Sequence, residues 1–184
     1  MKRLALGSVV VLLTVVAAPV RGQVPDFSGT WKLDPSKSQI AEAAGLAGLI
    51  GAGVPEMLHV TQTANGAVVV ESQINESHSR IYKPSGKTAT PVGQAGTITM
   101  TSKLDGATLV SEGRQETVAG DSTIVRDVKE VFALSADGRT LTINVTTTAA
   151  GDTNASTLVF TRTQAAGPCE SWPTPCKAFP QPKN

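Results

Sequence analysis

Most of this chain alternates between apolar and polar residues with a period of two. The segment from Thr97 to Leu104 is a clear example, with Ile98 and Met100 on one face and Thr99 and Thr101 on the other. This period is typical of β-strands that bury one face and expose the other, because successive side chains of a strand point to opposite sides. The alternation therefore predicts a sheet whose apolar face lines a core.

Tight turns separate the alternating segments. Asn65-Gly66 and Asp105-Gly106 favour the two-residue turns of β-hairpins, and Gly138 and Gly151 indicate two more. Turns this short join consecutive strands, so a meander is simpler than a Greek key, and closing the meander removes exposed sheet edges. We predict an all-β, antiparallel, up-and-down barrel of about eight or nine strands, in preference to an open sandwich, within one domain over residues 23–164.

The remaining segments are assigned by their turn residues and periodicity. The predicted strands cover residues 27–33, 57–63, 67–74, 77–83, 97–104, 107–115, 122–134, 140–148 and 155–163. Lys87 to Ala95 is predicted as a loop because it contains proline and glycine. Ser38 to Ile50 is predicted as one short helix, since Ser38 can cap its start and apolar residues recur at helical spacing. Its glycines weaken that prediction.

The first 22 residues have the features of a secretory signal. Lys2 and Arg3 precede an apolar stretch, and small residues prepare a cleavage site before Gln23. The alternative is a membrane anchor, but the apolar stretch is short for a span and is closed by Pro19 and Arg21. We expect an exported protein, periplasmic or extracellular, with residues 1–22 removed.

Residues 165–184 differ in composition from the rest of the chain. Repeated prolines there exclude regular structure and predict an irregular tail. Cys169 and Cys176 are the two cysteines of the chain. We predict that they form a disulfide, because an exported chain meets an oxidising compartment and two thiols without a nearby histidine make a poor zinc site. The bridge would pin down the tail.

Charge and motifs exclude several classes of function. Without residues 1–22 the chain has 13 basic and 15 acidic residues, a net charge of −2, and no basic stripe for a nucleic acid. No glycine-rich phosphate loop or nucleophile elbow is present, so neither a nucleotide cofactor nor a hydrolase is indicated. His59 and His78 lack metal-ligand spacing and are interpreted as surface histidines. The sequence predicts no metal site and no enzyme.

One strand breaks the alternation. If Phe132 and Leu134 point inward, the period also places Arg126 and Glu130 inside the barrel. Either these charges form a polar anchor inside a ligand cavity, or a bulge near Asp127 rotates half of the strand and leaves both charges in solvent. We favour the bulge, because unpaired charges are costly to bury.

The start of the first strand carries a short motif. Phe27-Ser28-Gly29-Thr30-Trp31 resembles the Gly-x-Trp signature of lipocalins and related calycin barrels, and is similar to the start of small exported bacterial lipocalin-like proteins. The resemblance implies structural roles for Gly29 and Trp31, with the indole closing the bottom of the barrel. It also implies that Arg162 packs across the indole face as a cation–π contact. The Thr-Asp-Tyr turn of lipocalins is absent.

Architecture and resemblance together favour a binding protein for a small hydrophobic ligand. The predicted apolar interior is formed by Val70, Ile98, Met100, Ile143 and Phe160, and Leu46, Leu49 and Ile50 are placed at its mouth. These last three belong to an uncharged, lid-like segment, residues 43–54. The alternative is a structural or protein-interaction module whose barrel is filled by its own side chains, with residues 43–54 contacting a partner or a membrane. The sequence leaves the oligomeric state open.

Overall fold

The structure is a computed structural model that describes residues 24–41, 54–63, 66–74, 76–92 and 96–164. Its regular elements are the strands β1 (Gly29–Leu33), β2 (Met57–Gln62), β3 (Val68–Ile74), β4 (Glu76–Tyr82), β5 (Gly86–Val92), β6 (Gly96–Asp105), β7 (Thr108–Ala119), β8 (Ser122–Leu134), β9 (Thr140–Ala149) and β10 (Asp152–Gln164). Within these residues, no helix is long and apolar enough to cross a membrane.

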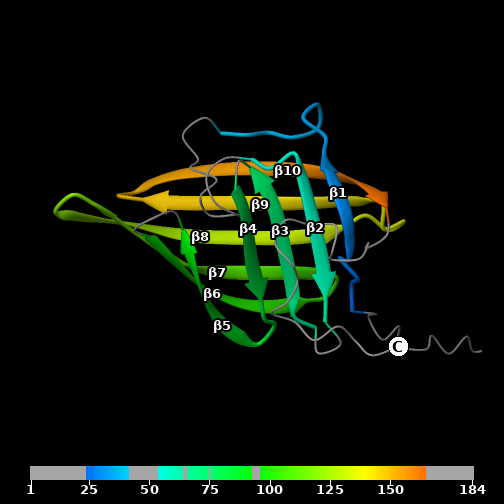
Figure 1. Cartoon of the computed structure of the whole chain (residues 1–184), viewed down its shortest axis with the longest axis horizontal. Coiled ribbons are helices and arrows are strands. Elements are labelled where there is room, and N and C mark those ends of the chain that lie inside the picture. Colours follow the sequence, from blue (N-terminus) through cyan, green and yellow to red (C-terminus); the bar gives the residue numbers. More distant parts are fainter. Residues whose placement is uncertain (1–23, 42–53, 64–65, 75, 93–95, 165–184) are drawn as a thin grey trace, which may run out of the picture.

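All the strands join one antiparallel sheet in the order β4-β3-β2-β1-β10-β9-β8-β7-β6-β5. Each strand pairs with its neighbour in sequence, except that β1 and β10 pair with each other while β4 and β5 form the two ends of the sheet. The sheet curls into two layers, with β1–β4 lying across β6–β10 (Figure 1). This arrangement confirms the predicted all-β antiparallel barrel and leaves it nearly closed.

The predicted strand number was too low because β5 was taken as a loop. The segment Gly86–Val92 pairs with β6 over its whole length, from Gly86 opposite Ser102 to Val92 opposite Gly96. Only Val92 of this strand is buried, so the apolar half of the alternation is missing. Pro91 is compatible with a strand here, because β5 is an edge strand that has a neighbour on one side only.

The predicted start of the helix at Ser38 was also wrong. Residues 38–41 run extended beside β10, and Gln39 forms a β-bridge with Thr157. The Ser38 hydroxyl donates a hydrogen bond of 2.8 Å to the Asp34 carbonyl and accepts one of 3.0 Å from the Val159 amide. Its hydroxyl therefore links the chain to β10 instead of capping a helix.

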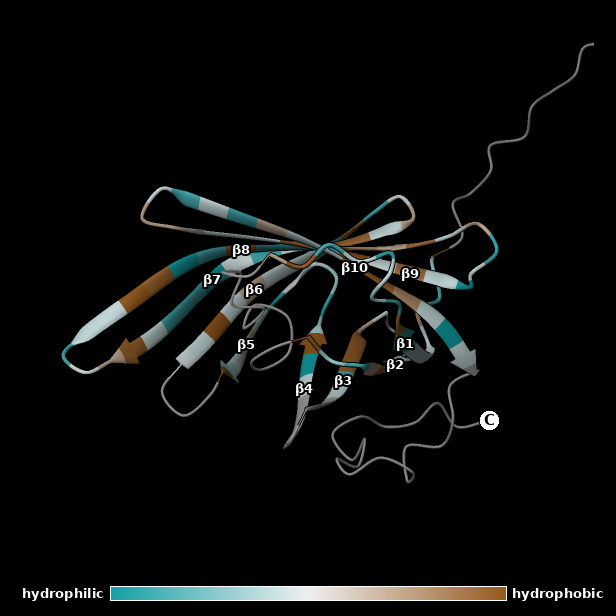
Figure 2. Ribbon diagram, turned by 90° about the horizontal axis from the view of Figure 1, so that it is seen from above, coloured by the Kyte–Doolittle hydropathy of each residue, from teal (hydrophilic) through white to brown (hydrophobic). Residues whose placement is uncertain are grey.

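The core consists of two apolar clusters on the inner faces of the layers. The larger one comprises Phe27, Trp31, Leu58, Val60, Val68, Val70, Tyr82, Leu109, Phe132, Leu141, Ile143, Val145, Leu158 and Phe160. The smaller one comprises Val92, Ile98, Met100 and Val128. Figure 2 shows that apolar and polar bands follow one another along β6–β8.

Several sequence predictions fall on residues that the structure does not describe. They are the signal at 1–22, the mouth residues Leu46, Leu49 and Ile50, most of the segment 43–54, and the tail 165–184 with Cys169 and Cys176. Val54 is described, and it packs against the larger apolar cluster.

Candidate functional site

Three polar side chains meet inside the barrel, surrounded by apolar residues. The Arg80 guanidinium donates from Nη1 to Oε1 of Glu130 at 2.7 Å, and the Tyr82 hydroxyl donates to Oε2 of the same carboxylate at 2.8 Å. Arg80 is 2% exposed, and Tyr82 and Glu130 are 0% exposed. A buried ion pair with a third hydrogen-bonding partner is therefore the central polar feature of the interior.

The three residues come from opposite layers. Arg80 and Tyr82 are two residues apart on β4, so they share the inner face, opposite Val70 and Val68 of β3. Glu130 lies on β8, six strands away along the sheet. The Tyr82 ring packs edge-on against Phe132 with 4.9 Å between ring centroids, which holds its hydroxyl at the height of the carboxylate.

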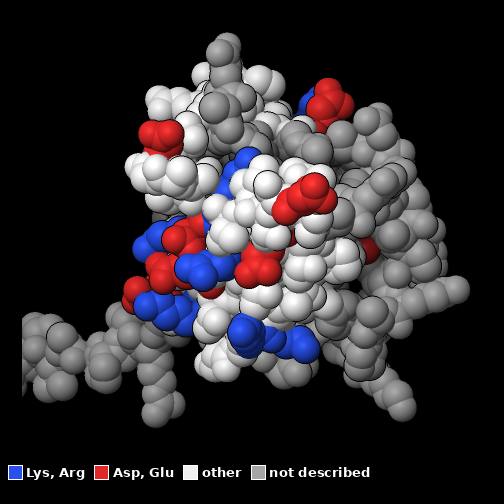
Figure 3. Space-filling model, turned by 90° about the vertical axis from the view of Figure 1, so that its left-hand side faces the viewer, with Lys and Arg blue, Asp and Glu red and all other residues white. Residues whose placement is uncertain are grey.

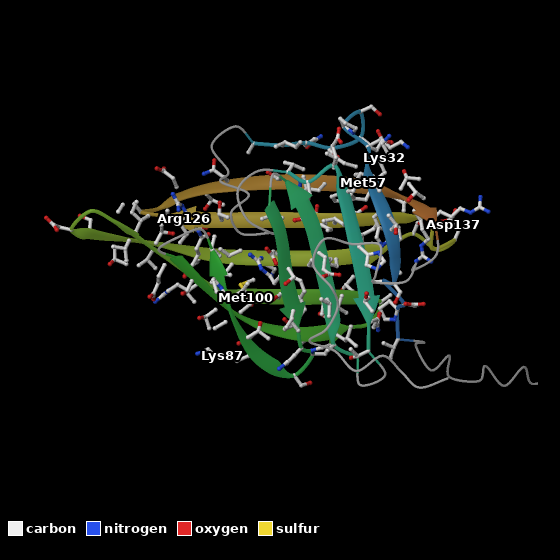
Figure 4. All side chains as sticks on the ribbon, viewed as in Figure 1. Lys32, Met57, Lys87, Met100, Arg126 and Asp137 are labelled. Atoms are coloured by element: carbon white, nitrogen blue, oxygen red, sulfur yellow. The ribbon has the colours of Figure 1, made fainter. Side chains whose placement is uncertain are left out.

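The predicted bulge near Asp127 was wrong. The register between β7 and β8 runs without interruption from Thr108 opposite Ala133 to Ala119 opposite Ser122, with Asp127 opposite Arg114. Glu130 therefore stays on the inner face, where Arg80 offsets part of the cost of burying its charge. Arg126 is half-buried and lies farther along β8, toward the β7–β8 hairpin (Figure 4).

Burial dominates the protonation of this group. It raises the pKa of Glu130 from 4.5 to about 7, although Arg80 and the Tyr82 hydroxyl act in the opposite direction. Burial also raises the pKa of Tyr82 well above 10, so the phenol keeps its proton. Burial disfavours the charged form of Arg80, but the carboxylate and the phenol outweigh this effect and raise its pKa. The guanidinium thus stays charged while Glu130 can change protonation near neutral pH.

Two serines extend the polar group along the inner face. The Ser102 and Ser111 hydroxyls are 2.9 Å apart and buried, and Ser111 is the register partner of Glu130. We call Arg80, Tyr82, Glu130, Ser102 and Ser111 the buried polar cluster. Within it, Nε of Arg80 has no hydrogen-bond partner among the residues that the structure describes. A buried donor without a partner is unusual in a folded protein and is commonly satisfied by water or a ligand.

The buried polar cluster separates the two apolar clusters. In register across β6–β10, its row reads Ser102, Ser111, Glu130, Val145 and Ser156. The row on one side reads Leu104, Leu109, Phe132, Ile143 and Leu158, and the row on the other side reads Met100, Gly113, Val128, Thr147 and Asn154. Along the strands the inner surface is therefore apolar on one side of the polar row and mixed on the other side, where Met100 and Val128 are apolar and Thr147 and Asn154 are polar.

The predicted ligand-contacting residues divide between these clusters. Val70, Ile143 and Phe160 belong to the larger cluster, where they are fully buried against other core side chains. Ile98 and Met100 belong to the smaller cluster on the far side of the polar row. The structure thus divides into two clusters the residues that the sequence treated as one group.

The Gly-x-Trp residues lie at the end of the larger cluster. Trp31 is fully buried, donates from Nε1 to the Phe27 carbonyl at 3.0 Å, and has the Arg162 guanidinium 4.5 Å from its ring centroid. Gly29 has φ of 147°, a conformation that residues with a side chain rarely adopt. The Arg162 guanidinium also donates a hydrogen bond of 3.2 Å to the Asp26 carbonyl, and this bond connects β10 to the residues that precede β1.

His59 is buried, contrary to the prediction of a surface histidine. It points away from the barrel interior, opposite Thr30 of β1 and Glu71 of β3, and its Nδ1 is 3.3 Å from Oγ1 of Thr30. Burial lowers its pKa. Among the described residues, no three His, Cys, Asp or Glu side chains are grouped as metal ligands. The side chain of His78 is not described.

The outer face of β5–β8 carries an open groove of about 480 Å³. It is lined by Lys87, Thr99, Thr101, Gly113, Arg114, Glu116 and Asp127. Acidic and basic side chains alternate on this face (Figure 3), and Arg114 pairs with Asp127 at 3.2 Å. The groove is polar and solvent-exposed, so it offers little to a hydrophobic ligand.

Comparison with known proteins gives matches in structure only. No protein-family model and no curated protein matches the sequence. The fatty-acid transporter REP1-NXSQ matches with a TM-score of 0.53 and 11% identity, over 75% of this chain and 96% of that chain. Lipid binding protein 8 of Caenorhabditis elegans matches with a TM-score of 0.50 and 10% identity, over 74% of this chain and 94% of that chain.

A fatty-acid-binding protein from Drosophila melanogaster brain tissue also matches. Its TM-score is 0.50, with 16% identity over 74% of this chain and 99% of that chain. The chain has a calycin-type barrel fold. At these identities the similarity concerns the path of the backbone, so the ligand has to be argued from this chain's own side chains.

Sequence reasoning found Glu130 but missed its partners. Arg80 and Tyr82 lie in a strand that was predicted for its turn residues and polar alternation, and nothing marked them as inward-facing. One available signal was the single tyrosine of the chain, two residues from an arginine on a strand. A spacing of two places both side chains on the same face, so an inward Tyr82 implies an inward Arg80.

Proposed function

We propose that this chain is a non-catalytic carrier that binds a small hydrophobic molecule inside its barrel. The observation that carries the proposal is the buried polar cluster between two apolar clusters. A binding site for an amphipathic molecule combines apolar walls with a few polar groups that fix its orientation. Similarity to a fatty-acid transporter and to lipid- and fatty-acid-binding proteins supports the same class of ligand.

The ligand is placed on the side of the smaller apolar cluster. The larger cluster contains aromatic and branched side chains that fill their end of the barrel. Next to the larger cluster, the polar row has serines on β6, β7 and β10, and their side chains are small. The polar end of the ligand would lie at the buried polar cluster, and its apolar part would lie against Ile98, Met100 and Val128.

Two matched isoleucines test this placement. Ile98 and Ile143 are each 0% exposed on the inner face, Ile98 in the smaller cluster and Ile143 in the larger one. We expect Ile98→Ala to change the affinity for an apolar fluorescent probe several-fold. Ile143→Ala should lower the free energy of unfolding by about 2–5 kcal/mol and leave the affinity unchanged. Equal effects of both variants on affinity would contradict the placement.

Native mass spectrometry tests the function itself, on protein that is expressed as residues 1–184 and purified gently from an exporting host. A small adduct that organic solvent removes would support the carrier, and its mass would give the ligand class. A bare protein that takes up nothing from a lipid extract would favour the filled structural module. The same spectrum tests export, because we propose that processing leaves Gln23 as the first residue.

A further inference from the structure

The charges of the buried polar cluster are already balanced by the protein. The ion pair between Arg80 and Glu130 is 2.7 Å long, and both partners are excluded from solvent. Each carboxylate oxygen of Glu130 already accepts a strong hydrogen bond, one from Arg80 and the other from Tyr82. The cation and the phenol that could hold a carboxylate head group therefore hold a carboxylate of the chain itself.

A charged head group would upset this balance. A ligand carboxylate beside the cluster would add a second negative charge next to Glu130 with one cation for both, and an ammonium would add a second positive charge next to Arg80. Burying an unmatched charge costs several kcal/mol. Arg126, the next charged residue along the inner face of β8, is half-buried and lies beyond the row of Met100 and Val128.

The polar atoms that remain suit an uncharged group. Nε of Arg80 is a buried donor that finds no partner in the described part of the chain, and the Ser102 and Ser111 hydroxyls can each donate or accept. A hydroxyl or carbonyl oxygen of a ligand can accept a hydrogen bond from Nε of Arg80. A ligand hydroxyl can also donate to the serine hydroxyls or accept from them. Such a group adds no charge to the low-dielectric interior.

We propose that the ligand is an uncharged amphiphile, such as a long-chain alcohol or ester, whose polar group lies beside the Arg80–Glu130 pair. This inference rests on the proposed carrier function and narrows its ligand class. It also separates the chain from its structural neighbours that are named for fatty acids. Glu130 acts as the built-in anion that makes a carboxylate head group unfavourable.

The test compares three ligands with the same chain and different head groups. Binding of decanol, decanoate and decylammonium to residues 23–184 is measured by isothermal titration calorimetry at pH 8. We expect decanol to bind about tenfold or more tightly than either ion, because each ion brings an unmatched charge into the barrel. Decanoate binding as tightly as decanol would overturn the inference, and no binding of any of the three would overturn the carrier function itself.

Glu130→Gln removes the built-in anion and leaves Arg80 without a matching charge. The affinity for decanoate should then rise about tenfold or more relative to the affinity for decanol. The control is Glu112→Gln, the same chemical change on the outer face of β7, where Glu112 is exposed and pairs with Lys129 at 2.7 Å. It should leave the ranking unchanged. If Glu130→Gln folds and the ranking stays as in the wild type, the inference is wrong; if it does not fold, the wild-type ranking decides.

Discussion

The protonation of Glu130 makes a sharp prediction about stability. Its pKa is about 7 in the folded protein and 4.5 is its ordinary value, so the folded state holds a proton that the unfolded state has lost between these pH values. Stability therefore falls as pH rises through this window and is level above it. The interval between 4.5 and about 7, at about 1.4 kcal/mol per pH unit, gives a loss of about 3 kcal/mol.

The difference between wild type and Glu130→Gln isolates this effect. Glutamine does not titrate, and the other ionisable groups largely cancel in the difference. Urea unfolding is followed by circular dichroism at steps from pH 4.5 to 8. We expect the wild-type free energy of unfolding, relative to that of the variant, to fall by about 3 kcal/mol up to pH 7 and then to stay constant.

Glu112→Gln is the control for the same measurement. Glu112 is exposed, and its pKa is lowered by the hydrogen bond and charge of Lys129. The ion pair of Glu112 stabilises the fold above the ordinary pKa of this carboxyl, and this stabilisation is lost as pH falls. The free energy of unfolding of the wild type relative to Glu112→Gln should therefore change little with pH, and in the opposite direction to the Glu130 difference. If the Glu130 difference were flat or rose with pH, the ion pair with Arg80 would outweigh burial and the reasoning would be refuted.

Two further predictions concern local structure. Ala150 has φ of 50° in the two-residue turn that joins β9 to β10, so Ala150→Asn should stabilise the fold by about 1 kcal/mol in urea unfolding. Ala136→Asn should give no gain, because Ala136 does not have a positive φ in its turn. Arg162→Ala removes the guanidinium from the Trp31 ring and should cost about 1 kcal/mol by the same assay. A change below about 0.3 kcal/mol would show that this cation–π contact contributes little.

The parts of the fold that sequence predicted well depend on local patterns. The period of two places Ile98 and Met100 on one face whatever the rest of the chain does, and a dipeptide such as Asp105-Gly106 makes a hairpin turn without distant help. β5 was missed because Val92 is its single buried residue, so the strand is defined by its pairing with β6 and has little pattern of its own.

The candidate site depends on distant contacts and was predicted only in part. The alternation on β8 already predicted that Glu130 faces inward. The high cost of burying an unpaired charge then favoured a bulge that would leave Glu130 in solvent. Glu130 is not unpaired, because Arg80 is 50 residues away in sequence but across the barrel in space. That pairing follows from the layers crossing each other, which no periodicity within one strand reveals.

The gap between β4 and β5 gives the buried ion pair a structural role in closing the barrel. Among the described residues no continuous ladder joins these two strands, so one edge of each is left without strand partners. Arg80 and Tyr82 nevertheless fasten β4 to β8 through side chains. Side chains therefore close the barrel between β4 and β8. Because the closed seam holds Glu130 at a raised pKa, we expect the seam to open more often as pH rises toward 7, with amides of β4 exchanging for deuterium sooner than those of β9 within the sheet.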